Sequence, residues 1–102
     1  MGLNVALETN RGECLGRVAD PTNILHRLLP GHDEKQYQCL RFVDWYGDTW
    51  FNRLQIEQFL LEWDMISSKA ATAEEIQLLA QIKGLAQRCQ KEPHLCLKFY
   101  GD

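Results

Sequence analysis

The polar side chains best suited to chemistry lie close together in the middle of the chain. Asp44 and Asp48 are separated by three residues, and a turn between them would bring both carboxylates to one edge. Such a pair can act as general acid and base, or it can bind a cation through oxygen ligands. Aspartate is also common at the start of turns, where it accepts hydrogen bonds from nearby backbone N–H groups. The pair therefore has two interpretations, a ligand site that would include Asn52 or a purely structural turn.

Two arginines flank these carboxylates, Arg41 before them and Arg53 after them. A guanidinium in such a place fixes an anionic ligand through its planar fork of N–H groups, or it pairs with a neighbouring aspartate. The first possibility predicts a small-ligand or metal-binding protein, or a hydrolase that uses Asp44 and Asp48. The second predicts ion pairs that only shape the turn. The sequence is compatible with both.

Aromatic residues are interleaved with these charges. Trp45 and Tyr46 stand next to each other, and Trp50 and Phe51 follow within a few residues. Neighbours in an extended segment point to opposite faces, so these rings cannot all lie in one core. Tryptophan and tyrosine beside arginine are typical anchors of a protein-interaction surface. The competing interpretation is that most of these rings fill the core of a small domain.

The rest of the sequence lacks recognisable site motifs. The four cysteines form no CxxC pair and the three histidines lack metal-ligand spacing, so we expect no metal and no cofactor. The net charge of −3 makes a general binder of nucleic-acid phosphates an unfavourable interpretation. No signal peptide is recognisable, and no apolar run approaches the roughly 20 residues of a membrane span. A cytoplasmic protein without membrane contact is expected.

Hydrophobic periodicity predicts the elements that would position these groups. Strands are expected over 2–9, 13–18, 37–44, 49–51 and up to residue 100 at the end of the chain, and helices over 20–29, 53–66 and 72–91. The helix starts rest on Asp20-Pro21, on Asn52 as a cap, and on a capping box from Thr72 to Glu75. The resulting order is ββ-α-ββ-α-α-β. It predicts a single α+β domain over residues 1–102, with a largely antiparallel sheet and helices packed on one face.

Several segments of the chain resemble a group of short uncharacterised bacterial proteins, which share a mid-chain YGDT-x-FN motif and a GD ending. The matching segments are Arg41–Asp44, Tyr46–Thr49, Phe51–Gln55 and Phe99–Asp102. The resemblance implies a bacterial origin and carries no activity, so it transfers no catalytic residue. Proteins of this kind are often products of mobile gene cassettes or toxin-neutralising partners.

The leading hypothesis from the sequence is a non-enzymatic interaction protein, which binds another protein or its own copy as a homodimer. Its surface would comprise the 45–53 segment and the outer side of the helix over 53–66. The residues expected to carry it are Trp45, Tyr46, Trp50, Arg53 and Arg41. The alternative is the ligand, metal or hydrolase site of Asp44, Asp48 and Asn52.

Overall fold

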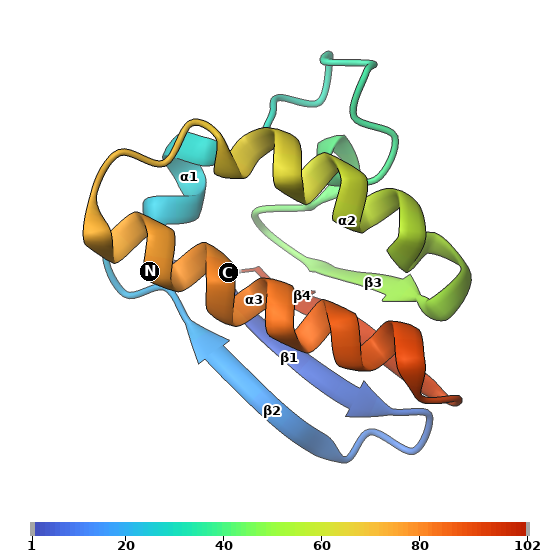
Figure 1. Cartoon of the computed structure of the whole chain (residues 1–102). Coiled ribbons are helices and arrows are strands. Elements are labelled where there is room, and N and C mark those ends of the chain that lie inside the picture. The colour runs from blue at the N-terminus through green and yellow to red at the C-terminus, as the bar shows by residue number, and fades with distance from the viewer. Residues whose placement is uncertain (1, 102) are drawn as a thin grey trace.

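The computed structural model describes residues 2–101, which fold into one sheet and three α-helices (Figure 1). In chain order the elements are β1 (Asn4–Thr9), β2 (Cys14–Ala19), α1 (Ile24–Leu28), the 3-10 helix η1 (Leu40–Phe42), β3 (Asp48–Asn52), α2 (Arg53–Ser67), α3 (Ala73–Lys91) and β4 (Leu95–Tyr100). The predicted α+β class is confirmed, with one strand fewer than expected. None of the helices formed by residues 2–101 is long and apolar enough to cross a membrane.

The four strands form one antiparallel sheet in the order β2-β1-β4-β3. A tight turn joins β1 to β2, and Gly12 occupies it with a φ of 86°, a conformation that favours glycine. The register between β1 and β2 shifts between Leu7 and Glu8, which marks a bulge in the pair. Strands β2 and β3 are the two edges of the sheet.

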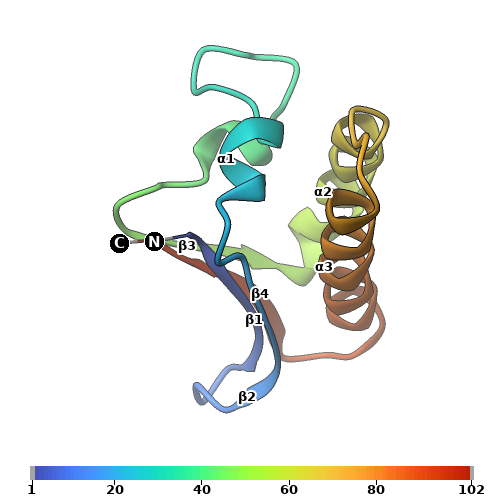
Figure 2. The same cartoon turned by 90° about the vertical axis from the view of Figure 1, so that its left-hand side faces the viewer.

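Helices α2 and α3 cover one face of this sheet and run beside each other (Figure 2). Their starts follow from the sequence. Asn52 accepts from the backbone N–H groups of Leu54 and Gln55, and Gln55 returns a bond to the Asn52 backbone, which completes a capping box. Thr72 and Glu75 form a second capping box at the start of α3. Both predicted helix starts are confirmed.

Aromatic rings fill the space between the helices and the sheet. Trp63 and Phe59 of α2 stack with centroids 5.1 Å apart, and Phe59 also contacts Phe51 of β3 and Phe99 of β4. The Trp63 indole N–H donates to the Leu79 carbonyl of α3 at 3.0 Å, so the buried ring leaves no polar atom without a partner. This cluster fixes α2 and α3 on the covered face.

The predicted strand over 37–44 is wrong. The segment forms turns and η1, and the fully buried carboxylate of Glu62 on α2 explains why. It accepts from the backbone N–H groups of Gln38, Cys39 and Leu40, at 2.8 to 3.0 Å for the shortest bond of each. These are donors that a strand would offer to a neighbouring strand. The second predicted hairpin is therefore absent from the described chain, and β3 pairs with β4 instead.

The first helix is shorter than predicted. Asp20 does act as its cap, because its two carboxylate oxygens accept from Ile24 N and Leu25 N at 2.9 and 2.8 Å. Asn23 adopts a left-handed conformation with a φ of 58°, and the helix begins only after it, at Ile24. Buried side chains of α1 join the core beside the end of the sheet where the chain termini lie (Figure 1).

Candidate functional site

No helix formed by residues 2–101 lies on the second face of the sheet, and its side chains form the main candidate surface (Figure 2). The strand registers define which side chains share this open face. They form three rows across β3, β4, β1 and β2, namely Asn52, Cys96, Glu8 and Cys14, then Trp50, Lys98, Ala6 and Arg17, then Asp48, Tyr100, Asn4 and Ala19. We call this set the open face.

Lys98 lies at the centre of the open face, between two aromatic rings. Its Nζ atom is 4.5 Å from the Trp50 ring centroid and 4.2 Å from that of Tyr100. The same atom lies 3.6 Å from Oδ2 of Asp48, and only 14% of the Lys98 side chain is exposed. Cation–π contacts and the ion pair hold the lysine stem flat on the sheet. Trp50 thereby gains a fixed support while 54% of its surface stays exposed.

A small residue on β1 allows long side chains to lie across the sheet. Ala6 is buried, and its small methyl group leaves room above β1 for long side chains from the flanking strands β2 and β4. The Arg17 guanidinium from β2 lies 5.5 Å from the Tyr100 ring centroid, on the far side of β1. The Tyr100 hydroxyl donates to the buried carboxylate of Glu8. The open face is therefore a layer of rings and charges held by contacts among themselves.

The open face carries two positive and two negative side chains, and one of the positive ones, Arg17, lacks an ion-pair partner among residues 2–101. Lys98 is matched by Asp48, and the Glu8 carboxylate is hydrogen-bonded to the Tyr100 hydroxyl. An arginine beside exposed aromatic rings is a typical contact residue at protein interfaces. The open face thus offers a rigid aromatic anchor and one available guanidinium.

Burial makes three of the four thiols poor nucleophiles. Burial raises the pKa of the Cys96 thiol on the open face, and the nearby Glu8 carboxylate raises it further, while Lys98 lowers it. In the core, burial raises the pKa of Cys39 and of Cys89 to about 11 in each case, helped by Glu62 and by Cys96 respectively. Because the thiolate is the reactive form, the raised pKa makes these three thiols poor nucleophiles at neutral pH.

The fold separates the aromatic residues predicted to act together. Trp45 is half-buried against the core, and its ring meets His26 edge-on at 5.0 Å. Tyr46 is 84% exposed in the turn before β3, and Trp50 lies on the open face. Arg53 is exposed at the first position of α2. Only Trp50 of this set belongs to the open face.

The fold also gives Asp44 and Asp48 different surroundings. Oδ1 of Asp44 accepts from the Tyr46 backbone N–H at 2.9 Å, whereas Asp48 faces Lys98 on the open face. Asn52 uses its side chain as the cap of α2. No group of three or more cysteine, histidine or acidic side chains within residues 2–101 is arranged to hold a metal ion.

The outer side of α2 forms a second apolar surface. Leu54, Leu61 and Met65 are exposed, at helical positions i, i+7 and i+11, and they point away from the core. The open face and this side of α2 face opposite directions, because α2 lies over the other face of the sheet (Figure 2). The single surface expected from the sequence is therefore split in two.

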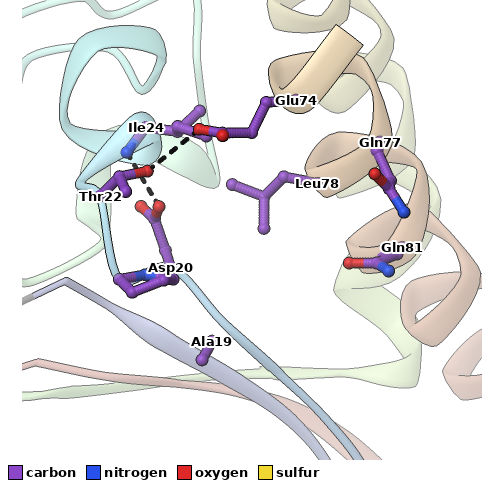
Figure 3. A pocket seen from close by; sticks show the side chains of 9 residues that line it. Ala19, Asp20, Thr22, Ile24, Glu74, Gln77, Leu78 and Gln81 are labelled. Atoms are coloured by element: carbon purple, nitrogen blue, oxygen red, sulfur yellow. Dashed lines mark hydrogen bonds between the residues drawn. The ribbon is translucent and has the colours of Figure 1, made fainter.

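A hollow of about 300 Å³ lies between α3 and the turn that leads into α1 (Figure 3). Its two acidic side chains already accept hydrogen bonds. Asp20 caps α1, and Glu74 accepts from the Thr22 hydroxyl at 3.3 Å. Gln77 and Gln81 complete the polar lining along α3. Since both carboxylates already serve the fold, the hollow is a weaker candidate than the open face.

The sequence interpretation missed the open-face residues that lie around Trp50, among them Arg17, Lys98 and Tyr100. The alternation of β4 contained part of the signal, because Leu95, Leu97 and Phe99 occupy every second position and leave Lys98 and Tyr100 opposite the core. The contribution of Arg17 depends on the pairing of β1 with both β2 and β4, which no local pattern specifies.

Comparisons of this chain with protein-family models, with curated proteins and with solved structures found no match.

Proposed function

We propose that this chain is a protein-interaction module without a catalytic role, and that its open face binds a short segment of another protein. The observation that carries the proposal is the position of Trp50, which is 54% exposed on the one face of the sheet that no helix covers. Tryptophan is enriched among the few residues that contribute most of the binding energy at protein interfaces. Lys98 supports the Trp50 ring.

The size of the open face supports a segment as the partner. Four strands about 4.8 Å apart and about 20 Å long present roughly 400 Å². Two such faces in contact would bury about 800 Å², which is below the roughly 1,200 Å² of a stable dimer. A homodimer through this face alone would be weak. A short strand or helix is narrower than this face and would fit within it.

The pairing of charges supports a segment with an acidic residue. Arg17 has no carboxylate partner within the described chain, and it lies beside the Tyr100 ring. A partner carboxylate would complete that site, while an apolar or aromatic side chain would pack on Trp50. The open face has no excess of positive charge and the chain carries a net charge of −3, and both favour a protein over a nucleic acid as the partner.

The test is a selection from a displayed random-peptide library on the immobilised protein. We expect enriched peptides to combine an acidic residue with apolar or aromatic ones. Trp50→Ala and Arg17→Gln should each weaken their binding by about 10-fold or more. Leu61→Ala removes a similarly exposed apolar side chain from the outer side of α2 and serves as the matched control. Failure to enrich any peptide, or a loss with Leu61→Ala and none with Trp50→Ala, would overturn the proposal.

A further inference from the structure

A second hollow, of about 350 Å³, lies beside η1 and is independent of the open face. Its lining comes entirely from the segment between α1 and β3, with His32, Arg41, Phe42 and Asp44 around it. Its volume is at the lower end of small-molecule sites. Two of its four side chains carry opposite charges.

Arg41 is held in a fixed orientation in this hollow. Its Nη1 group donates to the His32 carbonyl at 3.1 Å, and its Cζ atom lies 4.1 Å from the Phe42 ring centroid. The buried Nε–H finds no acceptor among residues 2–101, and no carboxylate of that range lies within 4.0 Å of the guanidinium. A pre-oriented guanidinium without a counter-ion is suited to a ligand carboxylate.

Asp44 brings the opposite charge to the same hollow. Its Oδ1 atom accepts from the Tyr46 N–H, and its Oδ2 atom lies 2.8 Å from the position that a Cβ at residue 47 would take, so Gly47 makes room for it. Asp44 is exposed and forms no ion pair with any lysine, arginine or histidine of residues 2–101. Arg41 and Asp44 thus line one hollow without pairing with each other.

We propose that this hollow binds a small zwitterion of the α-amino-acid class. The ligand carboxylate would pair with Arg41, its ammonium group would pair with Asp44, and its side chain would pack against Phe42, which is exposed. A ligand with both charges satisfies both side chains at once. A phosphate dianion would meet repulsion from Asp44, and a simple amine would meet repulsion from Arg41.

The test uses leucine as the probe and two blocked forms of it as matched ligands. N-acetyl-leucine keeps the carboxylate and lacks the ammonium group, and leucine amide keeps the ammonium group and lacks the carboxylate. We expect saturable binding of leucine by calorimetry or by NMR titration. Each blocked form should bind at least about 10-fold more weakly than leucine. Inorganic phosphate should not bind. Equal binding of leucine and either blocked form, or no saturable binding of leucine at millimolar concentration, would overturn the proposal.

Variants separate this site from its surroundings. Asp44→Asn keeps an oxygen that can accept from the Tyr46 N–H and removes the charge, and Arg41→Gln removes the guanidinium. Each should weaken leucine binding by about 10- to 100-fold. Asp48→Asn makes the same chemical change on the open face, outside this hollow, and should leave leucine binding unaltered. A leucine affinity that Asp44→Asn leaves unchanged would contradict the assignment.

Discussion

The ammonium group of Lys98 lies 4.5 Å from the centre of the Trp50 ring, and the two residues are direct partners across β4 and β3. Their contact has a structural and a functional consequence. It holds a large aromatic ring in place on a surface that no helix covers, and it keeps the lysine from projecting into solvent. The Trp50 side chain has therefore already lost its rotamer freedom on folding, so binding a partner costs less conformational entropy.

Replacing Lys98 by methionine should lower the free energy of unfolding by about 1–2 kcal/mol. The substitution keeps an apolar stem and removes two cation–π contacts, each contributing about 0.5–1 kcal/mol at exposed sites, and one weak ion pair. Lys83→Met is the matched control, because Lys83 pairs with Asp64 at 2.8 Å and has no cation–π contact within residues 2–101. In urea unfolding, Lys83→Met should lower the free energy of unfolding by less than about 0.5 kcal/mol. Equal losses for the two variants would contradict the role of the rings.

Glu62→Ala should be among the most damaging substitutions on α2. It would leave three backbone N–H groups without their acceptor, two of them in the buried residues Cys39 and Leu40, which costs about 3 kcal/mol or more. Glu57→Ala removes the same side chain from an exposed position of that helix and should change stability by less than about 0.5 kcal/mol. Hydrogen exchange should also show lost protection at Gln38, Cys39 and Leu40. If the amides of these residues keep their protection in Glu62→Ala, the proposed anchor of η1 is wrong.

Two glycine substitutions should have opposite effects. Gly84 lies within α3, and apart from its chain neighbours and the backbone of its own helix nothing lies within 4 Å of the position that a Cβ would take, so Gly84→Ala should raise stability by about 0.5–1 kcal/mol. At Gly101 a Cβ would collide with the backbone of Gly47 and Trp45, so Gly101→Ala should lower stability. Thermal unfolding of both variants checks the signs. The Gly101 N–H donates to the Gly47 carbonyl at 2.7 Å. A higher melting temperature for Gly101→Ala would contradict the close backbone packing at this position.

Glu75 should make the protein sensitive to acid. The backbone N–H of Ala71, then Arg27 and the backbone N–H of Thr72, lower the pKa of the Glu75 carboxyl from 4.5 to about 2. A group whose pKa is lowered on folding contributes stability above its unfolded pKa. That contribution is lost as the pH falls toward its folded pKa.

Urea unfolding of the wild type and of Glu75→Gln between pH 7 and pH 2.5 checks this expectation. The difference in unfolding free energy should be constant above about pH 4.5 and should shrink below it. A difference that does not change with pH would mean that Glu75 acts only through neutral hydrogen bonds.

Local signals in the sequence predicted most of the secondary structure. The caps at Asn52 and Thr72 placed the starts of α2 and α3, because each satisfies N–H groups within its own first turn. The alternation of β4 gave its covered face. The strand over 37–44 failed for the opposite reason. Its N–H groups bind Glu62, which lies 22 to 24 residues further along the chain.

The candidate site was harder to predict than the fold. Trp45 and Trp50 have the same chemistry and lie five residues apart, yet one packs against the core and the other lies on the open face. Their separation depends on where β3 begins and on its pairing with β4. Arg17 comes from the far edge of the sheet, so its approach to the Tyr100 ring depends on the strand order β2-β1-β4. Neither relationship has a local sequence signature.

The most direct test of the central claim is an NMR titration of the labelled protein with a selected peptide that contains acidic and apolar residues. We predict that the largest amide shifts will fall on open-face residues of β1, β2 and β4, with Ala6, Arg17 and Lys98 among them, and on Trp50. The indole N–H signal of Trp50 should move, and that of the buried Trp63 should not. Shifts concentrated on Leu54, Leu61 and Met65 would contradict the account, because they would place the binding surface on the outer side of α2.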